Sequence, residues 1–138
     1  MLFAFSLRKI AEKLYNEGYI SYPRTETDMF EPNFDLNTLI ERQAPDNRWG
    51  QFAQNLLNGG FRQPRNGKNN DKAHPPIHPT REGMNLQGDE RKVHDFITRR
   101  FLACCSENAK GNETNVTAKL GQETFTTHGM SSFLNDCN

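Results

Sequence analysis

The fold of this chain is decided by a short stretch near its N-terminus, which runs Gly18-Tyr19-Ile20-Ser21-Tyr22-Pro23-Arg24-Thr25-Glu26-Thr27. Glycine is the residue type that most often stops a helix, so Gly18 is predicted to end a helix that precedes the tyrosines. Pro23 fixes its own φ and disfavours the α conformation at Tyr22, so an extended segment is predicted. Residues two apart in an extended chain project to the same side, which places the Tyr22 hydroxyl near the Arg24 guanidinium.

A tyrosine beside an arginine can do chemistry on phosphodiesters. A free phenol has a pKa of about 10 and is a weak nucleophile at neutral pH unless nearby positive charge stabilises the phenolate. Arg24 can supply this charge to Tyr22. On chemistry alone the commoner explanation is a strand that ends in a turn around a packed aromatic side chain, because most tyrosines pack and most arginines are solvated.

The elements on either side are predicted from hydrophobic periodicity. Helices are predicted at 6–17, with Ser6 as N-cap, and at 37–43, 47–58 and 89–105, with a long loop at 61–88. In the third helix Trp49 and Phe52 are expected in the core, and the inward face of the last helix is predicted to be Val93, Phe96, Ile97, Phe101 and Cys104. Alternating residues at 114–120 and 123–128, joined by Gly121-Gln122, predict a hairpin. The chain is therefore expected to be α-rich, then β, and α+β overall.

Three blocks of sequence resemble one known family. The stretch 18–27 is similar to the active-site tyrosine signature of type IA DNA topoisomerases, in the topoisomerase III form. Residues 71–80, Asp-Lys-Ala-His-Pro-Pro-Ile-His-Pro-Thr, resemble the histidine motif of these enzymes, and residues 96–105 resemble the helix after it, in the alpha form. The resemblance covers about residues 7 to 130. It implies a winged-helix-like domain with the tyrosine at 1–105, where 1–5 have no counterpart, and the start of a β-rich gate domain at 106–138.

The resemblance also implies roles for individual side chains. Tyr22 is expected to form a 5′-phosphotyrosyl link to DNA, and Arg24 to hold the scissile phosphate. His74 is expected to contact a DNA phosphate nearby, and Thr25 to donate a hydrogen bond to phosphate. His78 has no clear counterpart role, Glu26 is expected to pair with Arg24 or another cation, and His94 and His128 are expected at the surface.

A basic loop follows the third predicted helix. Its cations outnumber its one acid, Asp71, and are expected to contact DNA phosphates: they are Arg62, Arg65, Lys68 and Lys72, with Arg81 just beyond. Asn and Gly residues between them predict a flexible, polar backbone. An ordinary solvated loop explains the same composition equally well. The choice between the two depends on the neighbouring motifs.

Length and composition limit what these 138 residues can do alone. Type IA topoisomerases need an acidic, metal-binding module, and no Asp-x-Asp pair that could chelate Mg²⁺ occurs here. The Mg²⁺ that the resemblance implies is therefore expected to be held by ligands outside this chain, and the chain alone is expected not to relax supercoiled DNA. We expect a truncated product or a partial gene model.

Other classes of protein are disfavoured by composition. The formal net charge is +0, so the chain as a whole does not attract polyanions strongly. Its three cysteines include no Cys-x-x-Cys pair for zinc, and adjacent Cys104 and Cys105 are expected to be reduced and near the core. No apolar stretch is long enough to span a bilayer.

Three classes of function remain open. The first is the nucleophile-bearing part of a type IA topoisomerase. The second is a non-catalytic, winged-helix-like module that binds single-stranded DNA through the basic loop. The third is a protein-interaction module. For the first class the resemblance implies a nuclear location, a RecQ-type helicase and OB-fold accessory proteins as partners, and a role in DNA recombination and repair.

Overall fold

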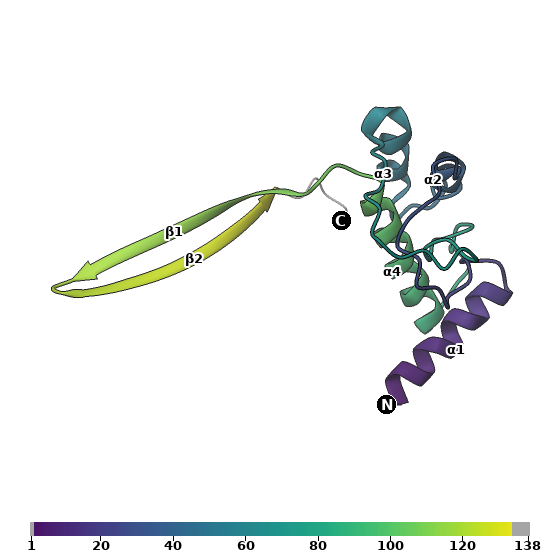
Figure 1. Ribbon diagram of the computed structural model, residues 1–138, viewed down its shortest axis with the longest axis horizontal. Coiled ribbons are helices and arrows are strands. Elements are labelled where there is room, and N and C mark those ends of the chain that lie inside the picture. Colours follow the sequence, from purple (N-terminus) through teal and green to yellow (C-terminus); the bar gives the residue numbers. More distant parts are fainter. Residues whose placement is uncertain (1, 134–138) are drawn as a thin grey trace. The chain divides into compact units, whose positions relative to one another are not determined.

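The chain folds into helices first and a β-hairpin afterwards, in a computed structural model that describes residues 2–133 (Figure 1). The helices are α1 (Leu2–Asn16), α2 (Leu36–Glu41), α3 (Gly50–Asn55) and α4 (Gly88–Cys104), and a wider π-type turn, η1 (Leu56–Gly60), follows α3. The strands are β1 (Lys110–Leu120) and β2 (Glu123–Phe133). The contacts divide the chain into a helical unit up to Glu107 and a second unit from Asn108. The predicted α+β class is confirmed, whereas the winged-helix-like and gate-domain roles of the two parts stay predictions.

The helix α1 delivers the tyrosine segment through a well-formed stop. Gly18 adopts φ 76°, its backbone N donates to Tyr15 O at 2.9 Å, and Tyr19 N donates to Leu14 O at 2.9 Å. These two bonds form a Schellman motif, in which the left-handed position favours glycine. Leu14 and Tyr19 are both buried and pack in one cluster, a hydrophobic contact that frequently accompanies this motif. The predicted stop is confirmed, but Ser6 as N-cap was wrong, because α1 begins at Leu2 and continues through Ser6.

Two apolar clusters hold the helical unit together. The larger one joins α2, α3, η1 and the end of α4, and its buried members include Leu36, Ile40, Trp49, Leu56 and Phe101. The smaller one joins Leu14, Tyr19, Ile20 and Leu86, with Val93 and Ile97 of α4 packed against it. The helix α4 therefore takes part in both clusters, and α1 packs against it (Figure 1). The predicted core position of Trp49 is confirmed.

The face of α4 that is buried differs from the predicted one. Phe96 is 71% exposed and Cys104 is exposed, so both predictions were wrong. The buried residues on this helix and directly after it are His94, Thr98, Phe101, Leu102 and Cys105, at the spacing i, i+4, i+7, i+8, i+11. The polar residues His94 and Thr98 thus occupy core positions, whereas hydropathy had predicted the apolar Phe96 and Cys104 there. Burial also raises the pKa of the Cys105 thiol to about 12, which keeps it protonated and unreactive.

The long segment between η1 and α4 is not a free loop. It runs beside the segment between α1 and α2, and Ile20 and Pro79 form an isolated antiparallel bridge. Ser21 N donates to His78 O at 2.9 Å, and Thr80 N donates to Tyr19 O at 3.0 Å. Farther along, Asp28 N donates to Asn69 O at 3.0 Å. This pairing places the histidine motif against the tyrosine segment.

The second unit is a two-stranded antiparallel hairpin. Its turn is Gly121-Gln122, where Gly121 has φ 63° and Leu120 pairs with Glu123, so the predicted turn is confirmed. The strands are longer than predicted, since pairing continues to Lys110 and Phe133. The described side chains at 110–131 are exposed on both faces. Regular alternation ends before the pairing does, which explains why the sequence predicted shorter strands.

No helix in the described part of the chain is long and apolar enough to cross a membrane.

Candidate active site

Tyr22 lies where the extended segment meets α1 and the histidine motif. Its side chain is half-buried. The Tyr22 ring packs edge-on against the Tyr15 ring of α1, with centroids 5.4 Å apart. On another side the ring of His74 lies 4.3 Å from the Tyr22 ring, at an interplanar angle of 34°. The structure therefore brings together the tyrosine and the histidine that the sequence predicted as site residues, although they are far apart in the chain.

Arg24 is ion-paired within the chain. Its Nε donates to Glu12 Oε1 at 2.9 Å, and its Nη2 contacts the same oxygen. These hydrogen bonds, and then the Glu12 charge, raise the pKa of the Arg24 guanidinium above its ordinary value. The side chain stays 55% exposed. Sequence reasoning gave Glu12 no role, because nothing in the sequence shows that this residue of the first helix lies opposite Arg24.

Thr25 and Asp71 connect the two halves of the site. Thr25 Oγ1 donates to Asp71 Oδ2 at 2.9 Å, and the backbone N of Asp71 donates to Thr27 Oγ1 at 3.0 Å. Asp71 Oδ1 accepts from the backbone N of both Ala73 and His74 at 2.9 Å. Thr25, predicted as a phosphate donor, is thus engaged with a carboxylate in this structure. By sequence, Asp71 stood out only as the one acid of a basic loop.

The four predicted DNA-contacting cations lie in different surroundings. Lys72 is closest to the site along the chain, in the turn just before His74, and adopts φ 58°. Arg65 and Lys68 are exposed on the segment that pairs with Asp28. Arg62 lies near the end of α4, where its guanidinium binds Glu107 at 2.7 Å and the carbonyls of Gly59 and Phe61. Of these four cations, Lys72 is the one next to the Tyr22–His74 pair, because it lies two residues before His74 in the chain.

His78 is part of the core. It is 5% exposed, and its ring lies 5.3 Å from Phe34, 6.0 Å from Phe30 and 6.3 Å from Phe101. Its Nδ1 donates to Pro76 O at 2.7 Å, and its backbone N donates to Ser21 Oγ at 2.9 Å. Burial lowers the pKa of this imidazole. His78 therefore anchors the histidine motif to the tyrosine segment and leaves His74 as the imidazole that faces Tyr22.

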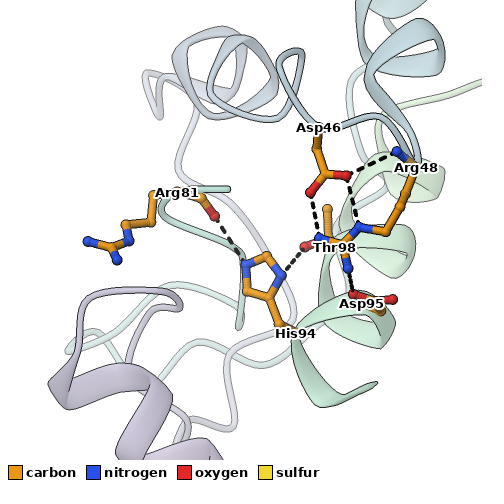
Figure 2. Close-up of polar contacts among 6 residues, drawn as sticks. All are labelled: Asp46, Arg48, Arg81, His94, Asp95 and Thr98. Atoms are coloured by element: carbon orange, nitrogen blue, oxygen red, sulfur yellow. Dashed lines mark hydrogen bonds and ion pairs between the residues drawn. The ribbon is translucent and has the colours of Figure 1, made fainter. Parts of the chain in front are cut away.

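His94 was predicted at the surface, and this prediction was wrong. Its side chain is fully buried, and Figure 2 shows its ring between a carbonyl and a hydroxyl. His94 Nε2 donates to Arg81 O at 3.1 Å, which leaves Nδ1 to accept from Thr98 Oγ1 at 3.4 Å. A Cβ added at Gly83 would lie 2.5 Å from Nδ1, so the chain passes closely over the ring. Burial lowers the pKa of His94.

His94 and Arg81 also contact Tyr19, at the start of the tyrosine segment. The Arg81 guanidinium lies 3.9 Å from the centre of the Tyr19 ring, and that ring lies 6.0 Å from the His94 ring. Tyr19 is three residues before Tyr22 and begins the extended segment. Because His94 fixes the backbone of Arg81, a residue of α4 stabilises the start of the segment that presents Tyr22.

A buried ion pair completes the cluster (Figure 2). Arg48 Nε donates to Asp46 Oδ1 at 2.8 Å, its Nη2 donates to Oδ2 at 2.5 Å, and its Nη1 binds Asp95 of α4. Asp46 is 1% exposed. Burial acts to raise the pKa of Asp46, but the hydrogen bonds and charge of Arg48 outweigh it and hold this pKa below its ordinary value. Arg48 thus joins the segment before α3 to α4.

The two buried histidines predict a pH dependence of stability. Both have a pKa lowered by burial, so between the folded pKa and about 6.5 the unfolded chain binds more protons. The free energy of unfolding should therefore fall as the pH is lowered from about 7 to 5, by at most about 1.4 kcal/mol per pH unit for each histidine. Urea unfolding followed by circular dichroism at several pH values measures this slope.

Matched variants assign the slope. His94→Gln should remove about half of it, because one of the two imidazoles no longer titrates. His128→Gln is the control, since His128 is exposed on β2. Carboxylates with lowered pKa values, such as Asp46, change the stability only below about pH 4. They therefore do not contribute to the slope between pH 7 and 5. An unchanged slope in His94→Gln would contradict the assignment.

Metal-binding side chains are not gathered at this site. Among the residues that the structure describes, no group of three or more His, Cys, Asp or Glu side chains could hold a metal ion.

Known proteins match nearly the whole chain. A family model described as DNA topoisomerase matches residues 2–133. Human DNA topoisomerase 3-alpha is 57% identical over 122 residues, which cover 88% of this chain. The chain belongs to the type IA DNA topoisomerase family, and it is topoisomerase III alpha-like.

Other relatives of this topoisomerase III alpha-like chain extend across eukaryotes. DNA topoisomerase 3 of Schizosaccharomyces pombe is 48% identical over 126 residues, and DNA topoisomerase 3-alpha of Drosophila melanogaster is 50% identical over 121 residues; each match covers 88% of this chain. The chain spans only 12% of the length of the human protein, 20% of the yeast protein and 10% of the fly protein.

Proposed function

We propose that this chain carries the DNA-cleaving tyrosine of a type IA topoisomerase. The observation that supports this most is the contact between the rings of Tyr22 and His74, 4.3 Å apart and contributed by two separate motifs. In the proposed reaction Tyr22 Oη loses its proton and forms a bond to the phosphorus of a single-stranded DNA phosphodiester. The bond from phosphorus to the 3′ oxygen breaks, and that oxygen takes a proton. The product is a 5′-phosphotyrosyl link, which the free 3′ hydroxyl can reverse without ATP.

Arg24 and His74 stabilise the phosphate in this proposal. Two nitrogens of the Arg24 guanidinium already bind one anionic oxygen, Glu12 Oε1, and a phosphate offers anionic oxygens to the same donors. A DNA phosphate would therefore replace Glu12 as its partner. His74 lies against the Tyr22 ring and would contact a neighbouring phosphate, while Lys72, Arg65 and Lys68 add exposed positive charge along the strand.

Further parts of the activity belong to residues outside this chain. Mg²⁺ would assist the displacement by stabilising charge on the reacting phosphate, and its carboxylate ligands would come from elsewhere, since these 138 residues contain no Asp-x-Asp pair. The proposal also includes a nuclear location and work on recombination and repair intermediates. Its proposed partners are a RecQ-type helicase and OB-fold accessory proteins.

A second candidate function is binding of single-stranded DNA without cleavage. The observation that favours it is the exposure of Arg65, Lys68 and Lys72 on one segment. It predicts DNA affinity without a covalent product.

One experiment separates the two candidates. The matching 122-residue segment of human DNA topoisomerase 3-alpha is replaced by that of this chain, which gives a hybrid enzyme. The hybrid is incubated with Mg²⁺ and a labelled oligonucleotide whose short 3′-hydroxyl piece dissociates after cleavage. A covalent adduct mapped to Tyr22 by mass spectrometry supports the cleavage proposal. A folded hybrid that binds DNA but forms no adduct, or forms it elsewhere, contradicts it.

Arg24→Lys should impair cleavage in the hybrid enzyme although it keeps the positive charge. Lysine is a point charge, whereas the arginine fork can hold two phosphate oxygens at once. Misplacing the phosphate by about 1 Å can cost on the order of 100-fold in rate. The initial rate of adduct formation should fall about that much, while the affinity for single-stranded DNA, measured by fluorescence anisotropy, should change little because several cations share it.

The matched control for this variant is Arg8→Lys. Arg8 is exposed on α1, the helix that also carries Glu12, so the same exchange there should leave the cleavage rate unchanged. Equal rates for arginine and lysine at position 24 would show that Arg24 contributes only bulk charge.

A further inference from the structure

We propose that Asp71 is a positioning residue, which holds the His74 imidazole against the Tyr22 phenol through hydrogen bonds to the turn that precedes His74. The cleavage role of this pair rests on the proposed function. The placement of His74 by Asp71 does not, because it concerns geometry that can be measured in the chain itself.

The Asp71 carboxylate closes the turn. Oδ1 accepts from the backbone N of Ala73 and of His74, both at 2.9 Å, so one oxygen fixes the two amides that lead into the histidine. Asn70 Oδ1 accepts from Lys72 N at 2.7 Å in the same turn. Between these bonds Lys72 adopts φ 58°, a left-handed conformation that a lysine rarely takes unless its surroundings impose it. The turn therefore depends on its acceptors.

The turn is also attached to the tyrosine segment at two points. Asp71 Oδ2 accepts from Thr25 Oγ1 at 2.9 Å, and Asp71 N donates to Thr27 Oγ1 at 3.0 Å. Thr25 lies three residues after Tyr22 on the same segment. On the other side of His74, Pro75 and Pro76 have a fixed φ and restrict the chain. With both neighbours held, the backbone of His74 is fixed beside the tyrosine segment, within reach of the ring contact with Tyr22.

The charge state of Asp71 suits this role. Hydrogen bonds from the His74 and Ala73 amides, and from the hydroxyl of Thr25, hold the pKa of its carboxyl far below the ordinary range. At neutral pH both oxygens are therefore acceptors, as the hydrogen bonds to this carboxylate require. Asp71 is exposed to solvent, but Oδ1 is bonded within the turn and Oδ2 is bonded to Thr25 of the tyrosine segment.

Asp28 provides a matched comparison on the same two segments. Its Oδ1 accepts from Asn69 N at 2.8 Å and its Oδ2 from Asn69 Nδ2 at 3.1 Å, so it also ties the histidine-bearing segment to the tyrosine-bearing one. These bonds reach residue 69 rather than the 71–74 turn. If Asp71 served only to tie the two segments together, loss of either carboxylate would have the same effect on His74.

The first test uses the 138-residue chain and nuclear Overhauser contacts between the rings of His74 and Tyr22. The contacts should be present in the unaltered chain, in Asp28→Ala and in Asp71→Asn, whose amide oxygen still accepts from the two backbone amides. They should be lost in Asp71→Ala, with the helical circular dichroism retained. Contacts that persist in Asp71→Ala, or that disappear equally in Asp28→Ala, would overturn the proposal.

The second test uses the hybrid enzyme and a double-mutant cycle. Asp71→Ala should lower the rate of adduct formation about 10- to 100-fold, as expected for a misplaced group, and Asp71→Asn should stay near the unaltered rate. In a His74→Ala background Asp71→Ala should have no further effect, because Asp71 acts through His74. An additive effect in that background, or equal losses for Asn and Ala, would overturn the proposal. A failure of the cleavage proposal is recognised separately, by an adduct on a residue other than Tyr22.

Discussion

Tyr22→Phe is expected to abolish covalent attachment of DNA in the hybrid enzyme. The exchange removes one oxygen and leaves the ring that packs edge-on against Tyr15 and lies 4.3 Å from His74, so the fold and the DNA-binding surface should be preserved. Loss of a catalytic nucleophile costs on the order of 10⁶-fold where it has been measured in a protease, so the adduct should fall below detection. The measurement is the amount of labelled oligonucleotide that migrates with denatured protein, beside the affinity for the intact strand.

The neighbouring tyrosine supplies the control. Tyr15 is 41% exposed and contacts the Tyr22 ring, so Tyr15→Phe removes a hydroxyl from the same small region. The adduct yield should not change in that variant. Residual adduct in Tyr22→Phe at the level of the unaltered hybrid would exclude Tyr22 as the nucleophile, whatever the effect at Tyr15.

Local chemistry predicted the parts of the fold that depend on backbone conformation. Gly18 ends α1 because only a glycine adopts its left-handed φ at low cost, and Gly121-Gln122 turns the hairpin for the same reason. The cap of α2 is equally local, although it was not among the predictions: Asp35 accepts from Thr38 N at 3.1 Å. Such positions are determined within a few residues, so a sequence pattern can predict them.

Partnerships between distant segments were not predictable in this way. Phe96 and Cys104 are apolar but face solvent, because His94 and Thr98 take the core positions and bind each other and the carbonyl of Arg81. The segment at 61–88 was predicted as a loop, because its prolines and asparagines disfavour regular helices and strands. Its backbone hydrogen bonds to the segment between α1 and α2 left no pattern in the sequence. Polar groups become core residues only when a partner from elsewhere satisfies their hydrogen bonds.

The site shows the same division. Sequence motifs predicted Tyr22, Arg24 and His74, and the structure places the first and last of these in contact. Glu12, which binds Arg24, and Asp71, which accepts from the backbone N of His74, lie on ordinary polar surfaces by sequence. Their importance depends on which backbone or side chain lies opposite, and only the three-dimensional arrangement supplies that information.

The largest effect on stability is expected from Arg48→Met in the 138-residue chain. This variant removes both side-chain hydrogen bonds that Arg48 donates to Asp46, whose side chain is fully buried. The carboxylate keeps the bond from the backbone N of residue 48, at 3.0 Å, but loses the positive charge beside it. Breaking a buried ion pair from one side costs about 3–5 kcal/mol. A domain of this size is stable by about 5–15 kcal/mol, so the helical unit should be partly unfolded near body temperature. Urea unfolding followed by helical circular dichroism measures the loss.

Two controls isolate the cause of this loss. Lys92→Ala removes an ion pair with Asp89 whose members are 80% and 68% exposed, and it should cost less than about 1 kcal/mol. The double variant Arg48→Met with Asp46→Leu should recover much of the stability, since no buried charge then remains unpaired.

The pH dependence gives a further distinction for Arg48→Met. In the unaltered chain the lowered pKa of Asp46 stabilises the fold above about pH 4, and this contribution is lost as the pH falls through the folded pKa. Without the guanidinium, burial outweighs the one backbone hydrogen bond that remains and raises the pKa of Asp46. The loss of stability caused by Arg48→Met, measured against the unaltered chain at the same pH, should therefore be smaller in acid than at neutral pH. A difference between the variant and the unaltered chain that stays the same from neutral to acid pH would show that Asp46 keeps another partner, and that Arg48 is not what allows this carboxylate to be buried.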